Sequence, residues 1–445
     1  IHNIYFIGIG GVGMSALAKY FVAVGKTVGG YDKKPSIATD SLIDLGVSIQ
    51  FEASPIKMDK LFIDPLKTLV VFTPAVSQTN PLLSYFKSNS FQVLKRSEVL
   101  GIVTKNTRCL AVAGTHGKTT TTSILAHLLY QNNEQMTAFI GGVSENYQSN
   151  FIQRGTEISV VEADEFDRSF LTLSPDFACI TSMDADHLDV YGSAEDMAAT
   201  FKEFVQKIKP SGKLFIKKGL PFDGITYGVN EPADYSALKV RILKGAYCFD
   251  IQTPSELIEN VHFSLPGVHN LSNALAAMAM ALEFGCSASG LVKALESYQG
   301  VQRRFTYQIK TEDFVFIDDY AHHPTEINAV HQAVREMYPA KKVAVVFQPH
   351  LFSRTRDFID EFAASLSQFD ATFLLDIYPA RELPIVGVDS EWLLGKIKSP
   401  IKKLISKSEI VGEIKDLGYP VFITIGAGDI GVEVTELKEK LSYAY

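Results

Sequence analysis

The sequence predicts an α/β protein of three domains, each built around a parallel or doubly wound sheet. Two observations predict this class: short apolar runs alternate with helical patterns, and three of these runs end in a turn that contains glycine. The length of 445 residues fits about three domains of ~150 residues each. We place the domains at residues 1–105, 106–300 and 301–445.

The apolar runs locate the individual elements. Residues 108–113 are apolar on both faces, as in a central parallel strand, and Gly285 is placed to end a helix. The expected strands are residues 4–7, 27–31, 69–72, 108–113, 158–162, 177–181, 314–317, 342–347, 372–375 and 421–425. The expected helices are residues 14–24, 81–87, 120–131 and 273–284.

Composition excludes several classes of protein. The net charge is −8 and no long run of Lys and Arg occurs, so a nucleic-acid partner is not expected. No run approaches the ~18 apolar residues that span a membrane, and the strand pattern at residues 4–7 argues against a leader peptide. The 4 cysteines are scattered, without disulfide or metal spacing, which favours a reducing, cytoplasmic compartment.

Residues 114–120 (Gly-Thr-His-Gly-Lys-Thr-Thr) form a loop suited to nucleotide phosphates. Glycines let backbone N–H groups approach a phosphate, and the following helix contributes its positive N-terminal end. Lys118 can bridge the outer phosphates and the Thr119 hydroxyl can ligate Mg²⁺. The loop is a shortened variant of the usual pattern, because Val112 stands where the first glycine is expected. An ordinary Gly/Thr-rich turn is the less favoured alternative.

A second glycine loop, Gly8, Gly10, Gly11 and Gly13, fits G-x-G-x-x-G between a strand and a helix. Asp32 follows near the end of the next strand, as in dinucleotide-binding proteins. The loop is compatible with any diphosphate, because backbone donors recognise phosphate rather than nicotinamide. We therefore expect Rossmann-like first and third domains around a central P-loop domain.

Polar side chains follow other strands. The acidic stretches 162–165 and 184–189 lie where carboxylates at the ends of parallel strands could bind Mg²⁺. Residues 318–324 contain a His-His-Pro sequence, and residues 347–355 contain a further histidine. A zinc site is disfavoured because no third ligand has suitable spacing. From their chemistry alone, these two segments could equally be polar loops.

Together these motifs resemble those of the Mur ligases of peptidoglycan synthesis. The resemblance runs nearly end to end, and it includes Arg-Arg-Phe at 303–305, His-Asn-Leu-Ser-Asn at 269–273 and Phe-Gln-Pro-His at 347–350. It is strongest to the members that join L-alanine to UDP-N-acetylmuramate. It implies an ADP-forming ligase in which ATP phosphorylates the lactyl carboxylate and the amine of alanine attacks the acyl phosphate.

The resemblance also implies residue roles. The first glycine loop would bind the UDP diphosphate, with Asp32 and Thr73 near the uridine. Thr119 and Glu162 would hold one Mg²⁺, His187 would contact a second, and Lys118 and Arg304 would neutralise the transferred phosphoryl group. The nucleotide contacts would be Gly114, Thr115, His116, Gly117, Lys118, Thr119, Thr120, Asn270, Asn273, Arg304 and Asp319. The amino-acid and lactyl contacts would be Tyr320, His322, His350 and Arg354.

Two positions depart from the family pattern. Leu351 stands where many members have an arginine, so a clamp for the alanine carboxylate would fall to Arg354. Lys202 lies near the place of the carbamoylated lysine that several Mur ligases use, and we expect a surface residue there. With three ligands on three domains, the third domain must close during turnover. We expect a monomer or a weak homodimer.

Other functions remain open from the sequence. One is the ligase that attaches a whole tripeptide to the same UDP-sugar, and another is a folylpolyglutamate-type ligase. A nicotinamide-dependent dehydrogenase would explain the first glycine loop but not residues 114–120. A P-loop regulatory switch would explain residues 114–120 but not the first glycine loop.

Overall fold

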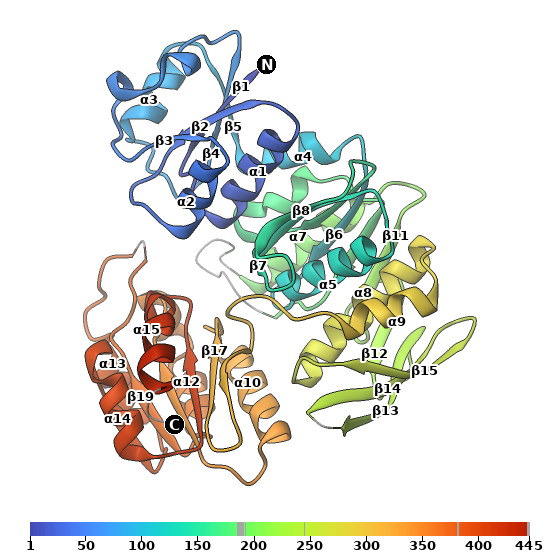
Figure 1. Ribbon diagram of the computed structural model, residues 1–445, viewed down its shortest axis with the longest axis vertical. Coiled ribbons are helices and arrows are strands. Elements are labelled where there is room, and N and C mark those ends of the chain that lie inside the picture. The colour runs from blue at the N-terminus through green and yellow to red at the C-terminus, as the bar shows by residue number, and fades with distance from the viewer. Residues whose placement is uncertain (185–190, 192, 244, 381, 443–445) are drawn as a thin grey trace. The chain divides into compact units, whose positions relative to one another are not determined.

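The computed structural model describes residues 1–184, 191, 193–243, 245–380 and 382–442. Two compact units are present (Figure 1). The first contains Ile1–Lys239, Phe249–Val261 and Asn273–Gln299, and the second contains Val240–Cys248, His262–Ser272 and Gly300–Tyr445. Three sheets with flanking helices confirm the predicted α/β class. The domain boundaries at residues 105 and 300 stay predictions.

The N-terminal sheet has the order β3-β2-β1-β4-β5, and all its pairs are parallel. The order reverses beside β1, so the carboxyl end of β1 lies at the crevice where ligands bind to such sheets. Its strands are β1 (Asn3–Ile7), β2 (Thr27–Tyr31), β3 (Ser48–Gln50), β4 (Thr68–Phe72) and β5 (Gln92–Lys95). Its helices are α1 (Val12–Ala23), α2 (Ile37–Asp44), α3 (Pro81–Ser88) and α4 (Arg96–Thr104).

The central sheet has the order β15-β14-β13-β12-β11-β10-β6-β9-β7-β8. The strand β6 (Arg108–Ala113), which is apolar and buried after its first residue, lies between β9 (Ile158–Glu162) and β10 (Phe177–Ile180), parallel to both. The remaining strands are β7 (Met136–Ser144), β8 (Ser149–Gln153), β11 (Lys213–Lys217), β12 (Ile225–Val229), β13 (Tyr235–Leu243), β14 (Ala246–Gln252) and β15 (Leu257–Phe263). The helices are α5 (Lys118–Gln131), α7 (Ala194–Gln206), α8 (Val268–Phe284) and α9 (Ala288–Glu296), with a 3-10 turn η3 (Phe166–Thr172).

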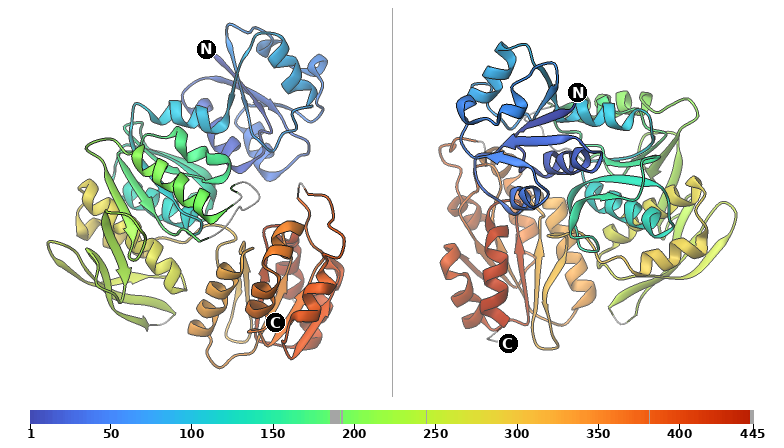
Figure 2. Two further views of the ribbon diagram at one scale, coloured as in Figure 1. Left: turned by 180° about the vertical axis from the view of Figure 1, so that it is seen from behind. Right: turned by 45° about the horizontal axis from the view of Figure 1, so that its top comes forward.

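The C-terminal sheet is doubly wound, with helices on both faces (Figure 2). Its order is β16-β17-β21-β18-β19-β20, and only β16 is antiparallel to its neighbour. The strands are β16 (Thr306–Lys310), β17 (Val315–Asp319), β18 (Val343–Phe347), β19 (Ala371–Leu374), β20 (Ile401–Leu404) and β21 (Val421–Ile425). The helices are α10 (Pro324–Met337), α11 (Phe352–Asp357), α12 (Ile359–Leu366), α13 (Ser390–Lys396), α14 (Ile410–Leu417) and α15 (Ile430–Ser442).

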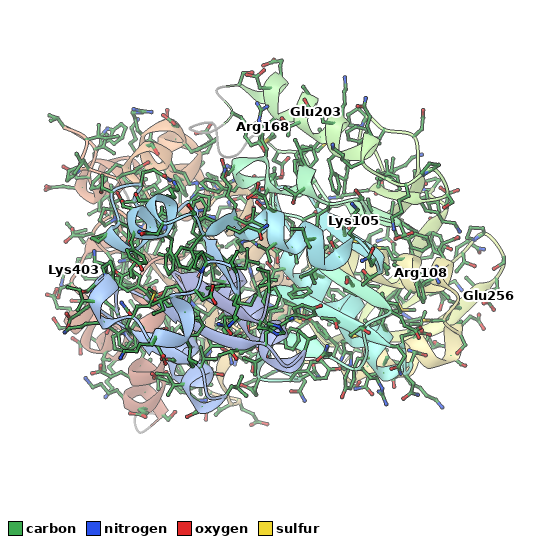
Figure 3. The ribbon with its side chains drawn as sticks, turned by 90° about the horizontal axis from the view of Figure 1, so that it is seen from above. Lys105, Arg108, Arg168, Glu203, Glu256 and Lys403 are labelled. Carbon is green, nitrogen blue, oxygen red and sulfur yellow. The ribbon has the colours of Figure 1, made fainter. Side chains whose placement is uncertain are left out.

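The surface carries charged side chains of both signs. Arg168, Glu203 and Lys403, which come from three different elements, all point outward (Figure 3). Lys202 on α7 is exposed, as expected. The four cysteines are buried, and burial raises the pKa of the Cys179 thiol to about 12. Among the described residues, no helix has the length and apolar character that crossing a membrane requires.

Candidate active site

The P-loop, residues 114–120, joins β6 to α5 through two left-handed glycines. Gly114 has φ +127° and Gly117, which precedes the first residue of α5, has φ +83°. A Cβ at Gly114 would lie 2.2 Å from Thr181 Oγ1, so the loop packs directly against the end of β10. There Ser182 Oγ accepts a hydrogen bond from the N–H of His116 over 2.8 Å. The sequence therefore folds into the predicted strand, loop and helix.

Lys118 is anchored by a buried carboxylate. Its Nζ lies 2.9 Å from Oε1 of Glu165, whose side chain is fully buried. The same Nζ donates a hydrogen bond to the Gly114 carbonyl over 2.7 Å. Burial opposes the charged ammonium, but Glu165, Asp164 and Glu162 outweigh burial and raise the pKa of Lys118. Lys118 is thus a fixed cation at the start of α5.

Thr119 and Glu162, the two predicted ligands of one Mg²⁺, lie together. The Thr119 hydroxyl donates to Glu162 Oε1 over 3.0 Å, and Glu162 Oε2 accepts from the N–H of Gly141 over 2.9 Å. Oxygen donors from a hydroxyl and a carboxylate suit Mg²⁺. His187, the predicted contact of a second Mg²⁺, lies outside the described residues.

The other P-loop residues contact the segment after β10. Thr115 Oγ1 lies 3.0 Å from Ser182 Oγ and accepts from the N–H of Asp184 over 3.0 Å. His116 Nε2 lies 3.3 Å from the Asp184 carboxylate. Thr120 is buried in the first turn of α5. These contacts fix the loop to the strand beside it.

Asn270 and Asn273 both lie in the first two turns of α8. Asn273 is in the first unit and faces the P-loop, because a Cβ at Gly117 would lie 2.5 Å from its Oδ1. Asn270 is in the second unit, where its Nδ2 donates to the Pro266 carbonyl over 2.7 Å. Each amide is buried.

The first glycine loop is held by the two polar residues predicted beside it. The N–H of Gly10 donates to Asp32 Oδ2 over 2.7 Å, and Asp32 Oδ1 accepts from the N–H of Lys33 over 2.7 Å. Gly8 has φ +87°, and a Cβ there would lie 3.0 Å from Thr73 Cγ2. The structure therefore brings Asp32 and Thr73 to this loop.

In the second unit, Asp319 is buried at the end of β17. Its oxygens accept from the N–H groups of Phe305 and Ala321, each over 2.7 Å. Burial raises the pKa of Asp319 to about 6, against the opposing effect of Arg304. Arg304 lies over the Tyr320 ring at 5.1 Å and 4.0 Å from Glu326 Oε1. The backbone on both sides of Arg304 is left-handed, with φ +61° and +50°, a conformation typical of constrained sites.

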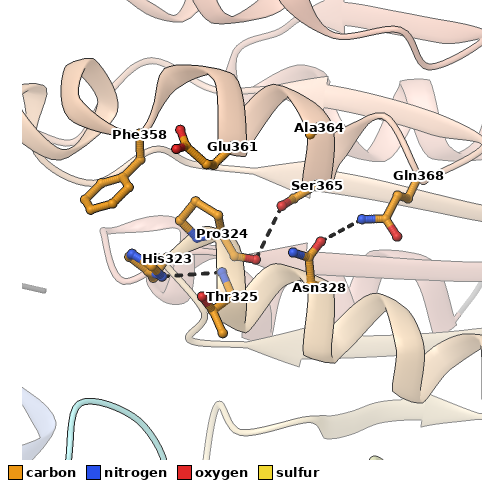
Figure 4. Close-up of a pocket in the computed structure, with 9 residues that line it drawn as sticks. All are labelled: His323, Pro324, Thr325, Asn328, Phe358, Glu361, Ala364, Ser365 and Gln368. Atoms are coloured by element: carbon orange, nitrogen blue, oxygen red, sulfur yellow. Dashed lines mark hydrogen bonds between the residues drawn. The ribbon is translucent and has the colours of Figure 1, made fainter. Parts of the chain in front are cut away.

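The histidine pair divides between two places. The ring of His322 lies 5.9 Å from that of His350, which stacks on Tyr378. His323 instead caps the N-terminus of α10, packs its ring against Phe358 at 4.7 Å and lines a pocket between α10 and α12 (Figure 4). The predicted residues Tyr320, His322 and His350 therefore group at the strand ends, without His323.

Leu351 is a structural residue. It is 5% exposed, has φ +72° and directly precedes α11, on which the buried Arg354 lies. Its carbonyl accepts from the Thr355 hydroxyl over 2.8 Å. Gln348 belongs to the Phe-Gln-Pro-His segment, but the sequence assigned it no role of its own. It is 4% exposed, its Nε2 donates to Asp429 Oδ1 over 2.7 Å, and its Oε1 accepts from the N–H of Ile430 over 2.9 Å.

Three family models match this chain in order. They are the Mur ligase family catalytic domain over residues 3–108, the Mur ligase middle domain over 112–281 and the Mur ligase glutamate ligase domain over 303–418. The chain belongs to the Mur ligase family. Mur ligases are ATP-dependent, which agrees with the P-loop geometry.

Several relatives that match nearly the full chain share one name. The UDP-N-acetylmuramate–L-alanine ligases of Flavobacterium johnsoniae and Flavobacterium psychrophilum are 56% and 57% identical to it, over 99% of this chain and 98% of theirs. The crystal structure of the UDP-N-acetylmuramate–alanine ligase of Thermotoga maritima covers all of both chains at 27% identity, with a TM-score of 0.84.

Proposed function

We propose that this Mur ligase joins L-alanine to the lactyl carboxylate of UDP-N-acetylmuramate with hydrolysis of ATP to ADP and phosphate. The observation that carries the proposal is the grouping of Lys118, Thr119 and Glu162 at the P-loop. The full-length relatives of this chain are named UDP-N-acetylmuramate–L-alanine ligases. The first glycine loop supplies a second place for a phosphate-bearing ligand in the same unit.

The reaction needs two steps, because a carboxylate has no competent leaving group. A lactyl carboxylate oxygen attacks the γ-phosphorus of ATP, and ADP leaves. The amine nitrogen of alanine then attacks the carbonyl carbon of the acyl phosphate, and a tetrahedral intermediate forms. Phosphate leaves as the amide forms and the nitrogen loses its proton to solvent. The protein contributes alignment and charge neutralisation.

The oxygen pair of Thr119 and Glu162 supports a Mg²⁺ site, since both donors are of the kind that Mg²⁺ prefers and lie within 3.0 Å of each other. Bound there, Mg²⁺ would offset charge on the phosphates of ATP. We assign His187 to a second metal only from the family resemblance. Lys118 orients the γ-phosphoryl group, and Arg304 adds positive charge during its transfer.

We assign the remaining roles from the family resemblance. Gly114, Thr115, His116, Gly117 and Thr120 surround the phosphates, while Asn270, Asn273 and Asp319 contact the rest of the nucleotide. Tyr320, His322, His350 and Arg354 receive the lactyl and amino-acid groups. Gly8, Gly10, Gly11, Gly13, Asp32 and Thr73 receive the UDP portion. We place the reaction in the cytoplasm, in a monomer or a weak homodimer.

Phosphate release tests the function directly. The protein is incubated with ATP, Mg²⁺ and UDP-N-acetylmuramate, and separately with L-alanine, glycine, L-serine or the tripeptide. We expect release with L-alanine that depends on the UDP-sugar. Release only with the tripeptide would assign the recycling reaction instead, and oxidation of a reduced nicotinamide cofactor would support a dehydrogenase.

Lys118→Ala separates the nucleotide site from the UDP-sugar site. We expect it to lower turnover about 100- to 1000-fold, because a cation aimed at the transferred charge is lost. Calorimetry should show unchanged UDP-N-acetylmuramate binding. Lys202→Ala, which removes an exposed lysine of α7, is the matched control and should leave both unchanged. Loss of UDP-sugar binding in a folded Lys118→Ala protein would contradict the assignment of the two loops.

A further inference from the structure

Arg96 lies against the first glycine loop, although none of the motifs contains it. It is the first residue of α4, directly after β5. A Cβ at Gly13 would lie 3.0 Å from both Cδ and Nη1 of Arg96, so the missing side chain at position 13 leaves the space that the guanidinium fills. The Arg96 side chain is 21% exposed, which leaves it accessible to a ligand.

The electrostatics at this point favour an anion. Gly13 is in the first turn of α1. This turn, Val12, Gly13 and Met14, carries no acidic side chain. A helix N-terminus is electropositive, and a guanidinium beside it is repelled unless negative charge lies nearby. The ion pair from Arg96 Nη2 to Asp164 is long, at 3.9 Å, and Asp164 is 38% exposed. Two positive groups, Arg96 and the N-terminus of α1, therefore lie together, and the long Arg96–Asp164 pair compensates the guanidinium only weakly.

The same acidic segment contacts both phosphate-binding loops. Asp164 and Glu165 are adjacent in sequence after β9; Asp164 pairs with Arg96, and Glu165 pairs with Lys118 of the P-loop. Arg96 thus resembles Lys118 in its position: each is a side-chain cation beside the N-terminus of the helix that follows a glycine loop. The difference is that the Lys118 pair is short and buried, whereas the Arg96 pair is long and open.

We propose that Arg96 binds the diphosphate of the UDP-sugar in the first glycine loop. The inference rests on the proposed function and adds a residue to that site. The guanidinium presents parallel N–H donors that match two phosphate oxygens, so it contributes both charge and orientation. Gly13 leaves room for this arrangement, because a Cβ there would make Arg96 shift from its present position.

Calorimetry on the full chain without ATP tests this assignment. Arg96→Ala, Arg96→Lys and the unchanged protein are titrated with UDP-N-acetylmuramate, UDP-N-acetylglucosamine, UDP and uridine. We expect Arg96→Ala to weaken binding of the three diphosphates about 10- to 100-fold, as for loss of a charge-assisted contact, and to leave uridine unaffected. Arg96→Lys should recover part of the loss, because a point charge replaces the fork.

Lys95→Ala is the matched control. Lys95 is the neighbouring residue, and its Nζ pairs with Asp167 over 2.8 Å between the same two segments, without touching the glycine loop. If the role of Arg96 were merely structural, Arg96→Ala would have a lower melting temperature and would bind every ligand more weakly, uridine included. We expect Lys95→Ala to bind every ligand as the unchanged protein does.

The outcomes separate the inference from the proposed function. Equal diphosphate affinity in the unchanged protein and Arg96→Ala would overturn the assignment. A loss confined to UDP-N-acetylmuramate would also overturn it, because that ligand alone in the series carries the lactyl carboxylate. An unchanged protein that binds none of the three diphosphates would instead reject the proposed function, and the inference with it.

Discussion

At the scale of single residues, the Lys118–Glu165 pair has the sharpest energetic consequence. Both groups are charged, and Glu165 is fully buried. Removing one partner takes the nearest opposite charge from the other in a buried place, so Lys118→Met and Glu165→Gln should each lower the free energy of unfolding by about 3–5 kcal/mol. The double variant should lose about 1–3 kcal/mol less than the sum of the two. Urea unfolding measures all three, and strict additivity would show that the pair is not coupled.

Asp319 predicts a pH dependence of stability. Its pKa rises from an ordinary 3.8 to about 6 in the folded protein, because burial disfavours the carboxylate. The folded state therefore binds the proton more tightly than the unfolded state, and this contribution is present below about pH 4 and lost as the pH rises to about 6.

The measurement is the difference in unfolding free energy between the protein and Asp319→Asn, which cannot ionise at this position. We expect the difference to change in favour of the variant by about 2 kcal/mol between pH 4 and pH 6, out of about 3 kcal/mol over the whole titration, and to be constant above pH 7. A difference that does not vary with pH would mean that Asp319 titrates with an ordinary pKa in the folded chain.

At the scale of elements, the β1–α1 loop allows backbone strain to be separated from ligand binding. Gly8 and Gly25 both have positive φ, +87° and +75°, so alanine at either should cost about 1–2 kcal/mol. Only Gly8 belongs to the glycine loop; a Cβ at Gly25 meets nothing within 4 Å.

We therefore expect Gly8→Ala and Gly25→Ala to lower the melting temperature similarly, whereas only Gly8→Ala weakens UDP binding in calorimetry. Equal UDP affinity in the two variants would show that the diphosphate does not lie against Gly8.

The elements that the sequence predicted share a property. The ten expected strands are all present, because each is an apolar run buried in a sheet. The strand β20 was missed since all four of its residues are exposed at the sheet edge and carry no apolar pattern. The strand β7 was missed because two glycines interrupt its apolar run. Helices α5 and α8 begin earlier than expected, because their first turns carry Thr119 and Asn270, polar residues that core patterns do not count.

At the scale of the whole molecule, the candidate site was predictable only in part. Motifs identified Lys118, Thr119 and Glu162, since their residue types and spacing reveal the chemistry. Their partners come from the fold. Ser182, which binds the N–H of His116, is 66 residues away in sequence, and only the parallel pairing of β6 with β10 brings it to the loop. No local pattern contains that information.

Domain closure is the prediction that belongs to this scale. ATP, UDP-sugar and amino acid are assigned to residues on all three sheets, so turnover requires them to meet. Small-angle scattering should show a smaller radius of gyration when ADP, Mg²⁺ and UDP-N-acetylmuramate are added together than with any one alone. An unchanged radius under all conditions would contradict a closing motion.

The internal partner of Lys118 also bears on which anions the P-loop accepts. Because Glu165 already neutralises the ammonium, an incoming anion must compete with a carboxylate held at 2.8 Å. A small ion such as sulfate offers little beyond the charge that Glu165 supplies. A nucleotide bound as we propose would add contacts along the loop backbone and at Asn273, which lies beside Gly117, and would thereby displace the internal partner. We therefore expect the buried glutamate to disfavour binding of small inorganic anions at this loop.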